Sequence, residues 1–184
     1  MIITASETKG IKCQVGDLSL LVDPEKNSSA DVILRSFYKL PFEQVPQNVV
    51  IGPGEYEIAG IHIKGIELRT ESGKDKIHTA YTAKMDDIRL CFLGTLESEL
   101  GEDVMDHIGE VDILFLGAGG PHLEAKKAAS LIKQLEPKAI VLTAGDMKQI
   151  AHEFGQKPEH EEKLVIKQKD LELLNSKLIW ISQK

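Results

Sequence analysis

The chain has 184 residues, 42% of them hydrophobic, and a formal net charge of −7 at pH 7. This length and composition predict a single domain over residues 1–184 with a sizeable buried core. The negative charge argues against a nucleic-acid partner, because binding to a phosphate backbone needs clustered Lys and Arg side chains. We find no apolar run of about eighteen residues, which a membrane helix would need, and no charged leader before an apolar segment. We therefore expect a cytoplasmic protein that makes no membrane contact.

Two cysteines, Cys13 and Cys91, both lie in apolar segments typical of strands. In that setting we expect reduced thiols in the core, and not a disulfide or a metal site.

The first half of the chain has the pattern of short strands joined by turns. We predict strands over residues 1–4, 11–15, 18–22, 30–36, 48–51, 55–58 and 61–68, followed by a hairpin of 77–84 with 88–93. The turn at Gly16-Asp17 is typical of a hairpin. Residues 37–45, which include Pro41, are expected to form an irregular loop. The pattern as a whole predicts an antiparallel meander.

The second half alternates strands with helices. We predict strands over 88–93, 112–116, 138–143, 164–167 and 178–182, and helices around residues 100–108, 128–135 and 146–154. Apolar residues at helical spacing predict the first two helices, and Asp146 followed by Gln149 resembles a capping box for the third. Buried strands with helical returns are typical of an α/β layer. Ligands bind such layers beyond the carboxyl ends of the strands, here just after Leu93, Leu116 and Thr143.

Four segments carry a family resemblance: LLVDP at residues 20–24, GPGEYEIAG at 52–60, LCFLGTLES at 90–98 and GGPHLEAKKAASLIKQLEPKAIVLTAGD at 119–146. Together they resemble the metallo-β-lactamase superfamily, in particular its small bacterial branch described as Zn-dependent hydrolases of the β-lactamase fold. The resemblance implies an α/β fold, a four-layer αββα sandwich with two sheets face to face, helices outside and a site at one sheet edge.

The chain departs from that family at the places where it binds metal. The motif H-x-H-x-D-H is replaced by SFYKLP at residues 36–41, a G-D turn by Gly94-Thr95, and the last histidine ligand falls at about Ala144. Zinc needs three or four converging N, S or O donors. We therefore expect a degenerate member without metal or other cofactor, although zinc is what the family implies. Phe37 and Tyr38, or Phe92, are expected to fill part of the volume that imidazoles and metals occupy in relatives.

Two functions remain open. The first is a non-catalytic binding or interaction module, a pseudoenzyme that binds a protein partner or a copy of itself as a homodimer. The second is a hydrolase of a small ester, lactone or phosphoester with a non-standard site. Its candidate residues are Tyr38, Lys39, Glu55, Thr95 and His122.

These candidates also have simple structural interpretations. Glu55 and Glu57 share one face of a strand and could act as acid and base, but acids beside a turn more often hold its backbone. His122 is a lone histidine at a strand exit, more often a surface residue than a catalyst. The glycines of residues 117–120 could cradle an anion, yet a tight turn before a helix explains them equally well. Asp23 is expected to fix a turn, and in the family this acid lies beneath the site.

Overall fold

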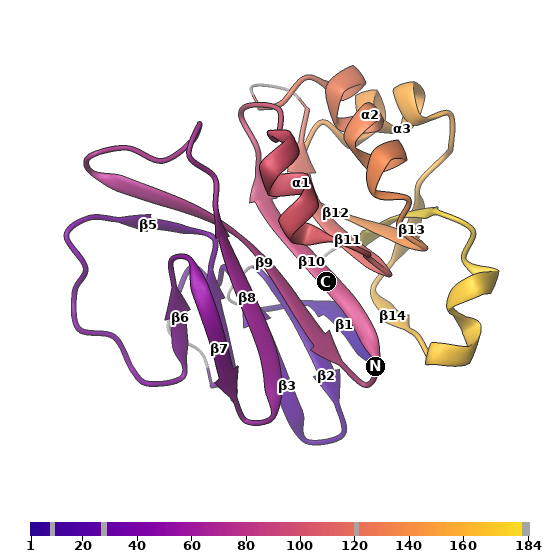
Figure 1. The fold of residues 1–184 in the computed structure, drawn as a ribbon. Coiled ribbons are helices and arrows are strands. Elements are labelled where there is room, and N and C mark those ends of the chain that lie inside the picture. The colour runs from indigo at the N-terminus through magenta and orange to yellow at the C-terminus, as the bar shows by residue number, and fades with distance from the viewer. Residues whose placement is uncertain (8–9, 27–28, 120–121, 182–184) are drawn as a thin grey trace.

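Two β-sheets pack face to face in the computed structural model, which describes residues 1–7, 10–26, 29–119 and 122–181 (Figure 1). The first sheet is formed, in spatial order, by β14 (Lys163–Val165), β1 (Ile2–Ala5), β2 (Ile11–Val15), β3 (Leu18–Val22), β4 (Val32–Arg35) and β6 (Val49–Ile51). The second is formed by β13 (Glu159–Glu161), β15 (Lys177–Ile181), β12 (Ala139–Gly145), β11 (Ile113–Ala118), β10 (Ile88–Thr95), β9 (Lys76–Met85), β8 (Ile61–Glu67) and β7 (Gly54–Ile58). The expected α/β sandwich with face-to-face sheets is confirmed.

The strand directions differ from the expected meander. The predicted hairpin of β9 and β10 is present and turns at Asp86 and Asp87, both in the left-handed region. An antiparallel meander for the whole first half is wrong, however, because β3, β4 and β6 run parallel to one another. The connections after β3 and β4 carry the chain back to the same end of the sheet, which a short hairpin turn cannot do. The carboxyl ends of β3 and β4 therefore lie at one edge.

Three α-helices of the described residues pack on the outer face of the second sheet (Figure 1). They are α1 (Glu102–Ile108), α2 (Ala125–Leu135) and α3 (Met147–Phe154), and a 3-10 helix, η1 (Gln168–Leu173), precedes β15. The residues that predicted α1 and α2 by their spacing, such as Val104 and Leu131, are buried against β10, β11 and β12. The Asp146 carboxylate accepts hydrogen bonds from two backbone N–H groups of α3, as the capping pattern predicted. None of the helices in the described ranges is long and apolar enough to cross a membrane.

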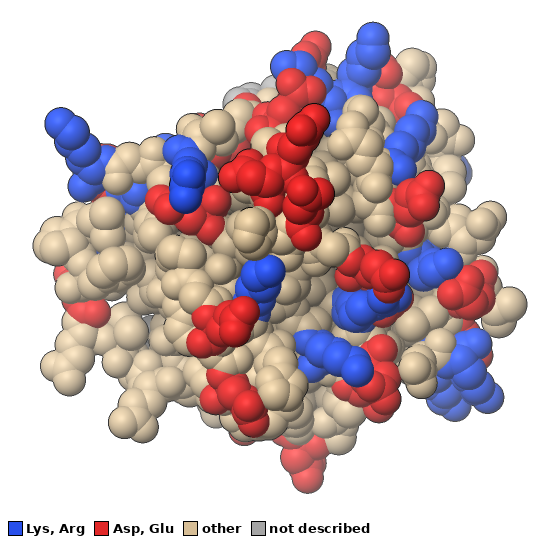
Figure 2. Space-filling model, viewed as in Figure 1, with Lys and Arg blue, Asp and Glu red and all other residues tan. Residues whose placement is uncertain are grey.

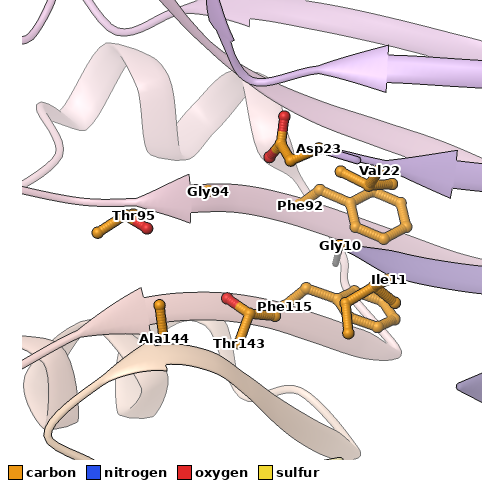
Figure 3. A pocket seen from close by; sticks show the side chains of 10 residues that line it. All are labelled: Gly10, Ile11, Val22, Asp23, Phe92, Gly94, Thr95, Phe115, Thr143 and Ala144. Carbon is orange, nitrogen blue, oxygen red and sulfur yellow. The ribbon is translucent and has the colours of Figure 1, made fainter. Parts of the chain in front are cut away.

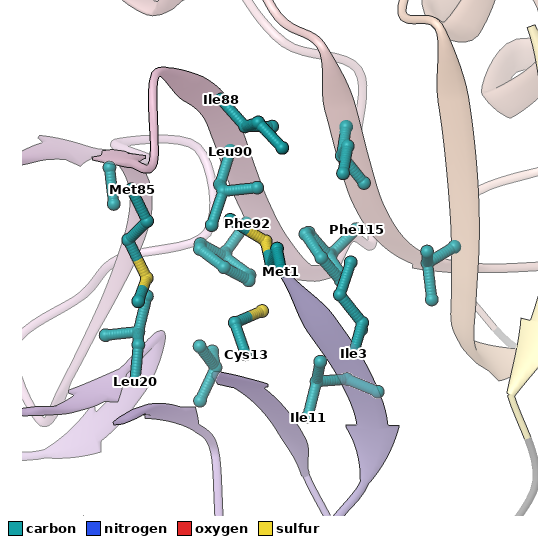
Figure 4. Close-up of a cluster of buried hydrophobic side chains, with 14 of the residues drawn as sticks. Met1, Ile3, Ile11, Cys13, Leu20, Met85, Ile88, Leu90, Phe92 and Phe115 are labelled. Carbon is teal, nitrogen blue, oxygen red and sulfur yellow. The ribbon is translucent and has the colours of Figure 1, made fainter. Parts of the chain in front are cut away.

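The main core lies between the two sheets (Figure 4). Ile3, Cys13 and Leu20 of the first sheet face Phe92 and Phe115 of the second. The rings of Phe92 and Phe115 stack with centroids 4.4 Å apart, a geometry that aromatic pairs favour. Burial of aromatic and branched side chains from both sheets supplies the main driving force for holding the sheets together.

Both cysteines are buried and unpaired, as expected. Burial raises the pKa of the Cys13 thiol, and it raises that of Cys91 to about 12. These thiols are therefore unreactive core side chains near neutral pH.

Part of the expected 37–45 loop is ordered as a strand. β5 (Phe37–Lys39) pairs antiparallel with the start of β9, so that Phe37 lies opposite His78 and Lys39 opposite Lys76. This strand extends the second sheet beyond the first and leads the segment after β4 away from the sheet edge (Figure 1).

Candidate functional site

A cavity of about 170 Å³ opens where the strand ends of the two sheets meet (Figure 3). The first sheet contributes the start of β2 and the end of β3, and the second contributes the ends of β10 and β12. The residues that line it are Gly10, Ile11, Val22, Asp23, Phe92, Gly94, Thr95, Phe115, Thr143 and Ala144. This is the place at which the sequence predicts ligand chemistry, beyond the carboxyl ends of parallel strands.

Asp23 is the acidic residue of the cavity. It follows β3 with a φ of 50°, a left-handed conformation uncommon outside glycine, and its N–H donates to the carbonyl of Leu34. Its carboxylate accepts hydrogen bonds from the Ser36 N–H at 2.7 Å and from the Ser36 hydroxyl. Burial raises the pKa of the Asp23 carboxyl, although the bonds from Ser36 oppose that shift. Asp23 therefore joins the end of β3 to the residue that follows β4. The sequence predicted that Asp23 fixes a turn, and the structure adds this contact with Ser36.

Ser36 lies directly over the glycine turn of β10. A Cβ atom on Gly94 would come within 2.5 Å of the Ser36 hydroxyl oxygen, and Gly94 has a φ of 65°. Glycine is therefore required here by close approach as well as by backbone conformation. The contact shows that a small, hydroxyl-bearing residue closes the space between the exits of β4 and β10.

The residues around this cavity do not fit a zinc ion. Of the described residues that line it, Asp23 alone is an Asp, Glu, His or Cys, and the other polar side chains are those of Thr95 and Thr143. Throughout the described ranges, no group of three or more His, Cys, Asp or Glu side chains converges as a metal site would require. Threonine hydroxyls and a single carboxylate are too few and too weak as donors for Zn²⁺.

The five candidate catalytic residues do not come together in this structure. Thr95 lines the cavity. Tyr38 and Lys39 lie on β5, and Glu55 is exposed on β7 opposite Lys64. His122 lies in the turn after β11, where its backbone N–H donates to the Gly119 carbonyl. Glu55 lines a separate groove of about 390 Å³ on the outer surface of the second sheet beside α1.

The aromatic residues expected to fill the vacated metal volume behave differently from one another. Phe92 is buried and lines the cavity, as expected. Phe37 is 43% exposed, with its ring edge against His78, and Tyr38 stacks on Phe42. Pairing of β5 with β9 directs both of these residues away, so the expectation is wrong for Phe37 and Tyr38.

The GEYE segment and the glycine-rich stretch at 117–120 both form turns, as far as the structure describes them. In GEYE, the Tyr56 hydroxyl donates back to the turn, 3.1 Å from the Gly52 carbonyl, while Glu55 and Glu57 are exposed. In the 117–120 stretch, Gly119 has a φ of 82° and packs against the Asp146 backbone, where a Cβ would come within 2.9 Å. These contacts support tight turns, and Gly120 and Pro121 lie outside the described residues.

One buried polar network was not predicted. Glu71, which lies between the predicted strands 61–68 and 77–84, is only 4% exposed. Its carboxylate accepts from the N–H groups of Glu97 and Ser98 at 2.9 and 3.0 Å and from the Ser98 hydroxyl, and it contacts His78 Nδ1 at 3.0 Å. Burial raises the pKa of Glu71, but the hydrogen bonds from His78, Ser98 and Glu97 outweigh it and hold the pKa below 4.5. The network ties the loop after β8 to the exit of β10, and no local pattern marks it.

The family assignment follows from comparison with known proteins. The family model described as "Beta-lactamase superfamily domain" matches residues 11–144, well over half of the chain. The chain belongs to the metallo-β-lactamase superfamily. This superfamily membership confirms the resemblance seen in the sequence, while a search of curated proteins gives no match.

Solved structures share the fold over nearly the full length. A Thermotoga maritima protein described as a Zn-dependent hydrolase of the superfamily is 20% identical, with a TM-score of 0.74, and the match covers 98% of this chain and 97% of that one. The metallo-β-lactamase fold protein YhfI from Bacillus subtilis is 11% identical, with a TM-score of 0.62 and coverage of 99% and 96%. Igni18, a metallo hydrolase from Ignicoccus hospitalis, is 14% identical, with a TM-score of 0.65 and coverage of 90% and 99%. At these identities the likeness establishes the fold.

Proposed function

We propose that this superfamily member is a non-catalytic binding module that keeps the cavity at the strand ends without a metal centre. The observation that carries the proposal is the contact between Ser36 and Asp23. Where the family motif begins, a serine donates both its hydroxyl and its backbone N–H to Asp23 of the cavity.

The chemistry of the lining supports binding over hydrolysis. Hydrolysis without a metal needs a base within hydrogen-bond reach of a nucleophile or water, and a group that stabilises the developing negative charge. The cavity provides two threonines and Asp23, whose carboxylate already accepts two hydrogen bonds. Among the described residues that line it, there is no lysine, arginine or histidine that could stabilise an oxyanion.

The surface does not support a nucleic-acid ligand. Acidic and basic side chains are interspersed on the face shown in Figure 2, which is typical of a solvated protein surface. With a formal net charge of −7, the chain is also repelled by polyanions. A small molecule or a protein partner is therefore the ligand class that we propose.

The experiment combines metal analysis with an activity panel. Protein purified without chelator is analysed for zinc and manganese, then assayed on generic esters, lactones and phosphodiesters with and without added Zn²⁺ and Mn²⁺. We expect metal well below one equivalent per chain and no turnover above buffer. Bound metal near one equivalent, or turnover abolished by Thr95→Val, Lys39→Ala, Glu55→Gln or His122→Ala, would overturn the proposal in favour of a hydrolase.

A further inference from the structure

The Asp23 carboxylate has no cationic partner among the residues that the structure describes. Arg35 and His78 lie near enough to favour its charged form. Arg35, however, donates to the Pro24 carbonyl, and His78 contacts Glu71 at 3.0 Å. Of the four lone-pair positions of a carboxylate, the Ser36 N–H and hydroxyl occupy two. A carboxylate set deep in a protein without a paired cation is costly, and a cationic ligand would relieve that cost.

The cavity beside this carboxylate has an apolar end and a hydroxyl-bearing end. Figure 3 shows the rings of Phe92 and Phe115 at one end and Thr95 at the other, with Asp23 and Thr143 on either side of β10. Within the described part of the chain, neither the Thr95 nor the Thr143 hydroxyl is engaged in a hydrogen bond, so both are available as acceptors. Aromatic rings beside an anionic group favour an organic cation, because both the ring faces and the carboxylate attract positive charge.

The size of the cavity limits the ligand. At about 170 Å³ it is close to the engineered protein cavity of about 150 Å³ that binds benzene. A guest of about six or seven heavy atoms therefore fits. A nucleotide, a peptide segment or a sugar chain is too large to enter.

From these observations we propose that the cavity binds a small organic ammonium ion, with its N–H groups donating to Asp23 and to a threonine hydroxyl and its hydrocarbon body against Phe92 and Phe115. This inference rests on the proposed binding function and assigns its ligand class. An anion is excluded by Asp23, and a neutral guest of the same shape leaves the carboxylate without a counter-charge.

The test uses a pair of ring molecules of equal size. Piperidinium carries the charge and two N–H donors, and tetrahydropyran is its neutral counterpart. Both are titrated into the full chain at pH 7 while backbone amide shifts are recorded by NMR. We expect piperidinium to shift the amides of Asp23, Gly94 and Thr95 and to bind at least about tenfold more tightly than tetrahydropyran, the difference expected for one charge-assisted hydrogen bond.

Two variants and one control identify the site. Asp23→Asn keeps the side-chain shape and should abolish the preference for piperidinium, whereas Asp106→Asn, an exposed acid on α1, should keep it. Should Asp23→Asn fail to fold, Ala144→Leu fills the cavity from the opposite wall and should abolish binding of both molecules without touching Asp23. Equal affinity for the two molecules, an absence of binding to the wild type, or shifts unchanged in the folded variants would overturn the inference. A negative result in this titration would overturn only the ligand class. The proposed non-catalytic function would be overturned separately, by bound metal or by turnover in the experiment described above.

Discussion

Ser36 donates its backbone N–H and its hydroxyl to the two carboxylate oxygens of Asp23, which binds the end of β4 to the end of β3. Ser36 also borders the Gly94 turn of β10, because its hydroxyl oxygen lies only 2.5 Å from the position that a Gly94 Cβ would take. A single serine thus joins exits from both sheets at the cavity. In a site with metal ligands this position would be held together by coordination; here it is held by a polar contact.

The first prediction concerns that contact. Ser36→Ala removes the hydroxyl donor from a deeply set carboxylate and should lower the free energy of unfolding by about 1–3 kcal/mol. Urea denaturation followed by circular dichroism measures the change. Ser130→Ala, an exposed serine on α2, is the matched control and should have an effect within about 0.5 kcal/mol. Equal effects of the two changes would show that the contact contributes nothing to stability.

The second prediction follows from the sign of the Asp23 pKa shift. Burial raises the pKa of Asp23 above its ordinary 3.8, so the folded state binds the proton more tightly than the unfolded state does. The stabilisation from this group is complete below pH 3.8 and is lost as the pH rises through the folded pKa. Relative to Asp23→Asn, which cannot ionise, the wild type should therefore lose stability as the pH rises above 3.8 and through the folded pKa of Asp23. A difference between the two unfolding free energies that stays constant with pH would contradict the assignment.

The third prediction concerns the buried Glu71 network. Glu71→Gln replaces an acceptor-only carboxylate that holds two backbone N–H groups and should cost about 2–3 kcal/mol at pH 7. The pKa of Glu71 is lowered, so its stabilisation is present above its ordinary 4.5 and is lost as the pH falls through the folded pKa. The cost of the substitution should therefore shrink in acid. Glu67→Gln is the control, because Glu67 is 39% exposed and pairs with Arg69 only at 3.9 Å.

The fourth prediction concerns the ion pair of Arg89 and Asp112. Two guanidinium nitrogens of Arg89 donate to the Asp112 carboxylate at 2.7 and 3.0 Å. The backbone N–H of Arg89 donates to the same carboxylate. Arg89→Lys keeps the charge but loses the fork geometry and should cost about 1–2 kcal/mol. Arg69→Lys, with a side chain 83% exposed, should change stability by less than about 0.5 kcal/mol. A loss at Arg89 no larger than that at Arg69 would mean that charge alone is enough.

The fifth prediction concerns metal removal. If packing and polar contacts hold the strand ends without the help of a metal, EDTA should leave the thermal midpoint unchanged within about 1 °C. The protein is purified without chelator, and its thermal midpoint is then measured by differential scanning calorimetry with and without EDTA. A fall of several degrees in EDTA would show that a bound ion stabilises the fold.

Much of the local structure could be predicted from the sequence, because local chemistry determines it. Val104 and Ile108 mark one face of α1, and Asp146 caps α3 through its own neighbours. The apolar run after Asp87 predicts β10, and the break at Gly94 predicts the strand exit at which the cavity lies. Each of these depends on residues a few positions apart, whose periodicity or hydrogen bonding is visible in the chain itself.

The tertiary structure alone decided what meets at the cavity. Nothing local indicates that β3 and β4 run parallel, that β5 carries Phe37 away from the cavity, or that Glu71 is buried against Ser98. Asp23 and Ser36 are thirteen positions apart, and Thr143 comes from a third strand more than a hundred residues later. Such contacts between distant residues depend on how the sheets pack. The free energy gained by burying the core of both sheets determines which strand ends become neighbours. The sequence therefore determined most of the elements and the family, whereas packing determined β5 and the chemistry of the site.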